Sequence, residues 1–183
     1  MHAMQREDHS GVVVSSTTEE QPRTAATLLL ATGGSIPAKS TELLEAACVV
    51  DEEVEMHPFA FRVHTHRHGV KVGGWAVSAD AEGNEQWSLV GERDPQLPQM
   101  FEAVANKSLK VRAGDIIAAR CEIKNDEVRD IEVGATGEDE MCNFYMMYWV
   151  EGDRVLQDNT CFSPGPPEYY WSREEAALAA HHH

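Results

Sequence analysis

Residues 64–69, His-Thr-His-Arg-His-Gly, place three imidazoles within five positions and are the first candidates for chemistry in this chain. If the segment is a strand, alternate side chains share a face, so His64 and His66 point the same way. Their backbones are then about 6–7 Å apart, which lets two ring nitrogens meet one metal ion at about 2 Å each. An exposed strand face that carries His and Arg without any chemical role is the alternative, and this segment alone does not exclude it.

A second segment, residues 140–150, places sulfur and polar side chains on one strand face. Strand alternation gives one face Met141, Asn143, Tyr145 and Met147, and the other Cys142, Phe144, Met146 and Tyr148. Taken alone, the first set is also compatible with a core face that has two polar interruptions. Two imidazoles and a thioether form a soft donor set suited to copper, especially Cu(I), whereas zinc is expected to recruit a Cys or a carboxylate.

Arg62 lies two residues before His64 and shares its strand face. The intervening apolar residues Phe59, Phe61 and Val63 point to the opposite face and are predicted to lie in the core. The sequence therefore predicts one strand that presents a cation and two imidazoles together, with an apolar face behind them.

The elements that must position these residues are short and strand-like. Nine segments cluster or alternate apolar residues between breaks rich in Gly, Pro, Asn and Asp; they are residues 25–32, 45–50, 59–66, 71–78, 85–92, 108–113, 115–123, 129–134 and 142–151. A helical stripe occurs only in the tail, residues 173–180, and the Pro-rich residues 163–171 are predicted to lie extended over the surface. The pattern predicts an all-β fold, an antiparallel β-sandwich of jelly-roll type with about nine strands.

Length and charge narrow the class of protein. The 183 residues suffice for one domain, and the 15 basic and 31 acidic residues give a formal net charge of -16. Nucleic acids and anionic membrane surfaces select for basic clusters, so neither is expected as a partner. No apolar run approaches the roughly 20 residues of a membrane span.

The four cysteines and the two chain ends indicate the cellular compartment and the bounds of the domain. Cys48, Cys121, Cys142 and Cys161 form no Cys-x-x-Cys pair and allow three pairings. Two disulfides, formed in the secretory-pathway lumen or outside the cell, are predicted over buried free thiols. Residues 1–20, which lack the apolar core of a signal peptide, are predicted to be a flexible linker or cloning remnant, residues 21–175 the domain, and residues 176–183 a tail that ends in a histidine tag remnant.

Four sequence blocks carry a family resemblance. "FAFRVHTHRHG", "DPQLPQMF", "GDIIAARC" and "DEMCNFYMMYW" together resemble the second copper domain of the peptidylglycine α-hydroxylating monooxygenases, within the copper type II ascorbate-dependent monooxygenases. The similarity runs from about Gln21 to Glu175. The dopamine β-monooxygenases share the His-Thr-His and Glu-Met-Cys elements but match the "PQLPQ" block less well.

The resemblance implies a nine-stranded jelly-roll-like sandwich that binds one catalytic copper, the M site, through His64, His66 and Met141. It implies that O2 is a co-substrate, that ascorbate is the external reductant, and that the α-carbon of a C-terminal glycine is hydroxylated. The substrate is then a glycine-extended peptide or an acyl-glycine, which is later cleaved to the amidated peptide.

The resemblance also assigns the remaining site residues. Arg62, Asn143 and Tyr145 are expected to anchor the glycine carboxylate, with Met147 lining the pocket; a guanidinium suits this task because its planar fork matches a carboxylate. The implied disulfides are Cys48–Cys161 and Cys121–Cys142.

Three departures from the family pattern qualify this expectation. Arg67 and His68 follow the His-Thr-His where relatives differ, and His68 is expected not to be a ligand. One extra residue lies between Cys48 and His64. The histidines of a preceding electron-transfer copper domain are missing before Gln21, so the chain is expected to be half of such an enzyme, either excised or standing alone, with a separate electron-transfer copper domain as a possible partner. The alternatives are a copper-binding module without efficient turnover and a secreted β-sandwich that binds a partner with its histidines unmetalled.

Overall fold

Twelve strands make up the regular structure of the chain. The computed structural model describes residues 9–173, and within them every regular element is a strand, which confirms the all-β prediction. The strands are β1 Arg23–Thr32, β2 Ser35–Ile36, β3 Thr41–Val49, β4 Glu55–His64, β5 Gly69–Ala79, β6 Glu85–Arg93, β7 Glu102–Ala103, β8 Val111–Arg112, β9 Ile116–Lys124, β10 Ile131–Glu132, β11 Asn143–Glu151 and β12 Thr160–Ser163. Each of the nine predicted segments overlaps one strand, whereas β2, β7 and β12 are too short to show a pattern in the sequence.

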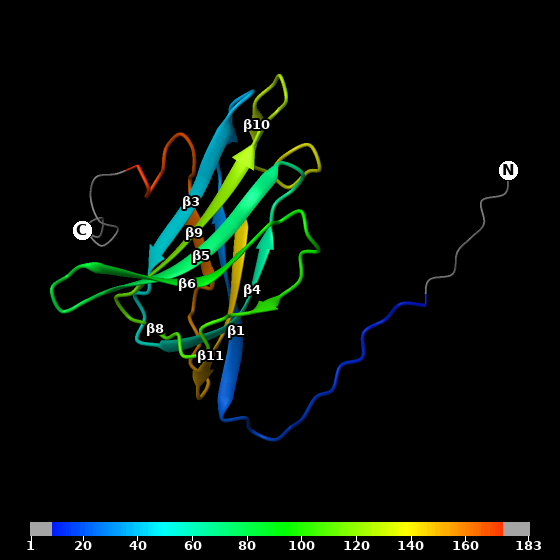
Figure 1. Ribbon diagram of the computed structural model, residues 1–183. Helices are drawn as coiled ribbons and strands as arrows, with labels where there is room; N and C mark the ends of the chain where they lie inside the picture. Colours follow the sequence, from blue (N-terminus) through cyan, green and yellow to red (C-terminus); the bar gives the residue numbers. More distant parts are fainter. Residues whose placement is uncertain (1–8, 174–183) are drawn as a thin grey trace.

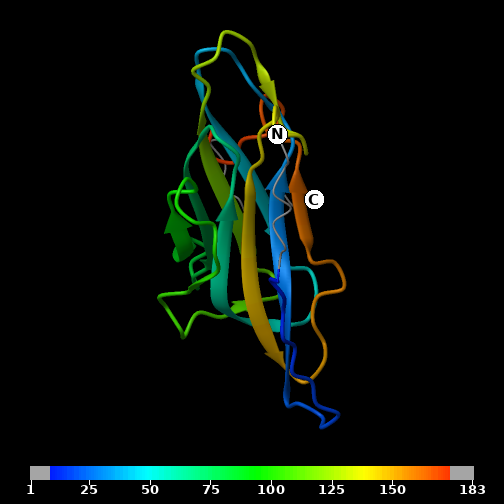
Figure 2. The same ribbon diagram turned by 90° about the vertical axis from the view of Figure 1, so that its right-hand side faces the viewer.

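The strands form two large sheets that pack as a sandwich (Figure 1). One has the order β12-β1-β11-β4-β7, with β8 also paired to β4, and the other has the order β3-β9-β5-β6. Figure 2 shows β4, β11, β1 and β12 side by side. The pairings between named strands are antiparallel, as predicted, except that of β1 with β12, which is parallel. The strand count is slightly higher than the predicted nine because short strands are added. A further two-stranded sheet joins β10 to β2.

The core lies between the two large sheets and is filled by alternate residues of each strand. In β11, Phe144, Met146 and Tyr148 are fully buried, while the residues between them are only partly buried. The rings of Phe144 and Phe61 stack with centroids 5.8 Å apart. Opposite them a Cβ at Gly74 would lie 2.4 Å from the Phe144 ring, so the sequence uses glycine where the second sheet approaches the aromatic pair most closely.

A β-bulge in β4 changes which side chains reach the core. Met147 pairs with Ala60 and the next residue of β11, Tyr148, pairs with Pro58, so Phe59 is the extra residue. The prediction that Phe59 lies in the core is therefore wrong: its side chain is 37% exposed, whereas Phe61 and Val63 beyond the bulge are buried as predicted. A bulge inserts one residue and reverses the alternation on its far side.

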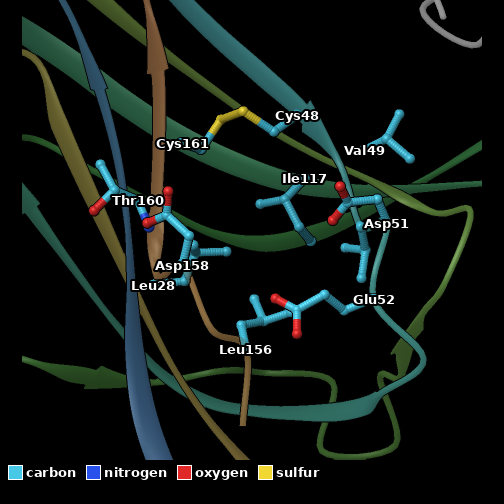
Figure 3. A pocket seen from close by; sticks show the side chains of 11 residues that line it. Leu28, Cys48, Val49, Asp51, Glu52, Ile117, Leu156, Asp158, Thr160 and Cys161 are labelled. Carbon is cyan, nitrogen blue, oxygen red and sulfur yellow. A yellow bond between two sulfur atoms is a disulfide. The ribbon is translucent and has the colours of Figure 1, made fainter.

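Two disulfides join the sheets across the core. Cys48 of β3 is bonded to Cys161 of β12, and Cys121 of β9 is bonded to Cys142, one residue before β11, with Cα–Cα distances of 5.8 and 5.7 Å. These are the two pairs that the resemblance implied. Figure 3 shows the Cys48–Cys161 bridge at a hollow between the sheets.

The ends of the chain lie outside the sandwich core. Residues 9–20 contain no strand and are exposed, and Figure 1 shows them leading away from the sheets. The Pro-rich segment is not fully extended: residues 165–169 form turns, and Trp171 then packs on β9, where Arg120 lies 4.2 Å from its ring centroid. Most of the predicted helical tail, from residue 174 onward, lies outside the described residues. The described chain contains no helix long and apolar enough to cross a membrane.

Candidate metal and carboxylate site

The candidate residues meet on the outer face of the six-stranded sheet because of the register between β4 and β11. Asn143 lies directly opposite His64, and Tyr145 lies directly opposite Arg62. Directly opposed residues have Cβ atoms about 4.5–5.5 Å apart, so the two strand faces predicted from alternation form one surface. All four side chains are partly buried.

Both candidate histidines are oriented by a hydrogen bond at Nδ1. The Nδ1 atom of His64 lies 2.5 Å from Oε1 of Gln99, and the Nδ1 atom of His66 lies 2.8 Å from the backbone oxygen of Asp139. Both partners accept hydrogen bonds, so each Nδ1 carries the proton and each Nε2 keeps its lone pair. The ring centroids are 5.4 Å apart with planes at 78°. Hydrogen bonding of the second ring nitrogen is how proteins fix a metal-ligating imidazole.

The orientation of the Gln99 amide follows from its other contacts. Its Nε2 atom donates to the backbone oxygens of Thr65, at 3.0 Å, and Pro95, at 2.8 Å. Two carbonyl acceptors require the amide nitrogen at that position, which leaves Oε1 facing His64. The His64 tautomer is thus determined by a loop 35 residues further along the chain.

Glu140 connects the loop of His66 to the segment of Met141. Its carboxylate is fully buried, and one oxygen accepts the backbone N–H groups of both His66, at 2.8 Å, and Met141, at 3.1 Å. The other oxygen accepts the N–H of His68 at 2.7 Å. Three N–H donors satisfy the buried charge and hold the two candidate ligand segments against each other.

The position of the Met141 sulfur is indicated by Asn143. The Asn143 Nδ2 atom lies 3.7 Å from Met141 Sδ and 3.3 Å from the Tyr145 hydroxyl oxygen. Because Asn143 is also the cross-strand neighbour of His64, the thioether lies on the face that carries the imidazoles. Met147, two residues beyond Tyr145, lies on the same face opposite Ala60.

The terminal guanidinium nitrogens of Arg62 have no carboxylate partner among residues 9–173, although the chain is strongly acidic. Its Nε atom donates to the backbone oxygen of Gln99 at 2.9 Å, and its guanidinium carbon lies 5.3 Å from the Tyr145 ring centroid. Within residues 9–173 no carboxylate pairs with it. The terminal nitrogens of the guanidinium, beside the Tyr145 hydroxyl and the Asn143 amide, can therefore receive an external carboxylate.

The turn that follows β4 explains the glycine of the His-Thr-His-Arg-His-Gly motif. A Cβ at Gly69 would lie 2.0 Å from the hydroxyl oxygen of Thr65, which is itself buried. His68 points to another surface, where its Nε2 lies 3.0 Å from Nε of Arg67 and 3.5 Å from the Glu127 carboxylate. That His68 is not a ligand stays a prediction.

Hydrogen bonds also fix the carboxylate of Asp139, whose backbone oxygen orients His66. The pKa of Asp139 is lowered, first by the backbone N–H of Thr136 and then by the Thr136 hydroxyl, with a smaller contribution from His66. The ionised side chain stabilises the turn of residues 136–139 and so keeps the carbonyl in place for the imidazole.

The donor set fits a metal that accepts a thioether. Among residues 9–173 no three side chains drawn from His, Cys, Asp and Glu converge as a metal site. Met141 adds a thioether to the two imidazoles on this face. Two imidazoles and a thioether suit copper better than zinc.

Sequence reasoning did not single out the residues that orient the candidate ligands. Gln99 and Glu140 occur within the blocks that carry the resemblance, but no spacing rule marks either as a contact of the histidines. Gln96 was missed as well; its amide donates to the backbone oxygens of His66 and Gly69. All three act on residues 64–69 from two segments that are distant in the sequence, residues 94–101 and 139–149, and only the folded chain brings them there.

The fold and the site together define a disulfide-linked β-sandwich that presents two imidazoles, a thioether and an arginine with no carboxylate partner among residues 9–173 on one face. The chain belongs to the copper type II ascorbate-dependent monooxygenase family, because the C-terminal domain of that family matches residues 23–174.

Curated relatives agree with this assignment. The chain is 35% identical over 173 residues to peptidyl-glycine alpha-amidating monooxygenase A of Xenopus laevis, covering 93% of the chain and 18% of that protein. It is 36% identical over 165 residues to peptidylglycine alpha-amidating monooxygenase of Rattus norvegicus, covering 89% of the chain and 16% of that protein. The chain thus spans less than a fifth of the length of these relatives.

Proposed function

We propose that the described domain is the catalytic copper domain of a peptidylglycine α-hydroxylating monooxygenase. It would bind one copper ion, use O2 with ascorbate as external reductant, and hydroxylate the α-carbon of a C-terminal glycine in a peptide. Family membership supports the class of reaction, and the unpaired Arg62 beside the two imidazoles is the observation that carries the choice of substrate. The two disulfides support an oxidising, secretory environment.

The proposed copper ligands are His64, His66 and Met141. The Nε2 lone pairs left by the hydrogen bonds to Gln99 and Asp139 support the two imidazoles, and the Asn143 contact supports the thioether. When bound, copper supplies the redox chemistry that activates O2. The protein supplies fixed ligands and a rigid sheet behind them, so the ligands need little rearrangement.

Arg62, Tyr145 and Asn143 would hold the substrate carboxylate. The guanidinium contributes charge and a planar fork, and the phenol and amide add neutral hydrogen bonds. Arg62 precedes His64 by two residues on the same face, so a carboxylate at Arg62 places the adjacent α-carbon close to the proposed metal position. Binding the substrate by its carboxylate therefore also orients the carbon that reacts.

Product formation tests the proposal directly. The copper-loaded chain is incubated with an acyl-glycine, O2 and several ascorbate concentrations, and the hydroxylated product is measured by mass spectrometry. We expect slow turnover whose rate rises with ascorbate beyond the point at which the copper is reduced, because the reaction needs two electrons and one copper stores one. Zero product at full copper loading would support a non-catalytic copper-binding module instead.

The carboxylate anchor has its own test. Arg62→Gln should weaken binding of an acyl-glycine by about 1.5–3 kcal/mol, as expected for a charge-assisted hydrogen bond, and should leave copper content unchanged. Arg154→Gln, which removes an exposed arginine outside the site, is the matched control. If the glycine amide binds wild type as well as the free acid does, the anchor is refuted.

A further inference from the structure

A surface hollow begins at the proposed site and leads away from the imidazoles. It has a volume of about 280 Å³ and is lined by Thr32, Gly33, Val133, Gly134, Met141, Asn143 and Phe162. Met141 and Asn143 belong to the proposed site, so the hollow opens where the substrate glycine would lie. Its far wall is Phe162, whose side chain is 63% exposed.

A second hollow continues the first. It has a volume of about 460 Å³ and is lined by Gly34, Ser35, Glu132, Val133, Phe162, Pro164, Pro166, Pro167 and Glu168. The two hollows share Val133 and Phe162 and therefore adjoin. Together they form one groove, which we call the upstream groove, from Asn143 to Glu168.

The two ends of the upstream groove differ in charge. The first hollow is lined by small and apolar residues apart from Thr32 and Asn143. The second contains the carboxylates of Glu132 and Glu168, and no Lys or Arg lines it. Glu132 accepts a hydrogen bond from the Ser35 hydroxyl at 2.9 Å, but among residues 9–173 neither carboxylate pairs with a cation. The second hollow therefore presents uncompensated negative charge.

The groove is preformed for an extended chain. Pro164, Pro166 and Pro167 restrict the backbone of one wall, and Gly34 has a φ of 115°, a conformation that favours glycine. Gly33 carries no side chain at the junction, where a Cβ would lie 3.4 Å from the Phe162 ring. A rigid, open floor reduces the entropy lost when a peptide binds.

We propose that the upstream groove binds the residues that precede the C-terminal glycine, and that it selects peptides with a basic side chain at the third residue before the glycine. This rests on the proposed function, since the glycine must be held at Arg62. The peptide backbone crosses the small and apolar first hollow, and the basic side chain enters the second hollow between Glu132 and Glu168.

The register of the sheet determines the position of the basic residue. Asn143 pairs with Ala31, and Ala31 pairs with Phe162. Two strand spacings of about 4.8 Å separate Asn143 from Phe162, or about 10 Å, and an extended peptide advances about 3.3 Å per residue. With the glycine lying over Asn143, one of the three proposed carboxylate contacts, the third residue before the glycine lies at Phe162, from which a lysine or arginine side chain reaches the two carboxylates.

Calorimetric titration of the copper-loaded chain tests the groove without requiring turnover. The probes are two acetylated, glycine-extended hexapeptides that differ only in lysine or glutamate at the third residue before the glycine. We expect wild type to bind the lysine peptide about 5–10-fold more tightly, as two partly exposed ion pairs would give, and Glu132→Gln/Glu168→Gln to bind both peptides alike. The preference should decrease as salt is added.

Two controls distinguish binding in the upstream groove from a general attraction to the acidic chain and from binding of the glycine carboxylate at Arg62. Glu53→Gln/Glu82→Gln removes the same charge from exposed positions elsewhere and should keep the preference; loss of the preference in this variant would overturn the proposal. Equal binding of both peptides by wild type, with the free acid still preferred to the amide, refutes the groove and leaves the proposed function standing. No preference for the free acid over the amide refutes the anchor itself.

Discussion

Hydrogen bonds to Nδ1 determine what His64 and His66 can offer a metal. Gln99 and the Asp139 carbonyl both accept, so both rings present Nε2. Without these partners either nitrogen could carry the proton and the rings could rotate. The chemistry of the proposed site therefore depends on residues that would not themselves touch the copper.

Met141→Ala tests the thioether. Because soft ligands favour the lower oxidation state, the variant should lose more affinity for Cu(I) than for Cu(II), measured by competition with chelators specific for each state. Met147→Ala, which replaces a methionine on the same face four residues beyond Asn143, is the matched control and should change neither affinity. Equal Cu(I) affinity in wild type and Met141→Ala would eliminate Met141 as a ligand.

Glu140→Gln tests the connection between the ligand segments. In the wild type, both carboxylate oxygens accept hydrogen bonds from backbone N–H groups. The glutamine amide replaces one of these acceptors by an NH2 donor, so at least one buried N–H loses its partner and the free energy of unfolding should fall by about 1–3 kcal/mol. Copper affinity should fall about 10–100-fold, as for other residues that orient ligands. Glu138→Gln, whose side chain is 77% exposed, should change neither quantity. Loss of stability with unchanged copper affinity would show that Glu140 has only a structural role.

At the scale of elements, the pairing of β4 with β11 builds the site. The bulge at Phe59 shifts the register only for the N-terminal part of β4, residues 55–58. The bulge leaves Arg62 and His64 in register with Tyr145 and Asn143. On the N-terminal side of the bulge, β4 also pairs with β8, and Glu55 of β4 forms ion pairs with Lys110 and with Arg112 of β8. The ion pairs at this end stabilise the strand that carries the candidate ligands.

Glu55 should make the stability of the β4–β8 pair depend on pH. Hydrogen bonds from Lys110 and then Arg112 lower its pKa from 4.5 to about 2. Because the folded-state pKa is lowered, the stabilisation is fully present above about pH 5 and is lost as the pH falls through the range from 4.5 to 2. In denaturant titrations Glu55→Gln should be less stable than wild type at about pH 6, and the difference should vanish near pH 2. A difference that persists at low pH would contradict the ion-pair origin; Glu53→Gln, an exposed neighbour, should match wild type throughout.

At the scale of the whole molecule, the two disulfides hold the sheets together behind the site. Cys48–Cys161 closes a loop with a sequence separation of 113, and Cys121–Cys142 one of 21. The second bridge ends one residue after Met141 and so attaches the candidate ligand segment to β9.

Loop length predicts how much each bridge contributes. In the chain-entropy model, replacing Cys48 and Cys161 by Ala should lower the free energy of unfolding by about 4–5 kcal/mol, and replacing Cys121 and Cys142 by about 3 kcal/mol. Guanidinium unfolding of the two double variants measures both values. A larger loss from the shorter loop would show that local packing, rather than loop closure, dominates.

The sequence by itself determined the all-β class and the residues that share a strand face. Both follow from local patterns, since alternation has a period of two and turn residues act over a few positions. The family resemblance added the disulfide pairing and the candidate ligand set. Alternation failed at Phe59 because a bulge is defined by the partner strand, and β12 could not be predicted from four residues whose burial depends on β1.

Only the tertiary structure decided how the candidate faces meet and what orients them. The register of β4 against β11 joins segments about 80 residues apart in the sequence. Gln99 is 35 residues from His64, and Glu140 is 74 residues from His66. Such contacts depend on sheet register and loop paths, which long-range packing of the core selects. The imidazole tautomers, the free end of Arg62 and the upstream groove are all consequences of that packing, so no local pattern in the sequence could have indicated them.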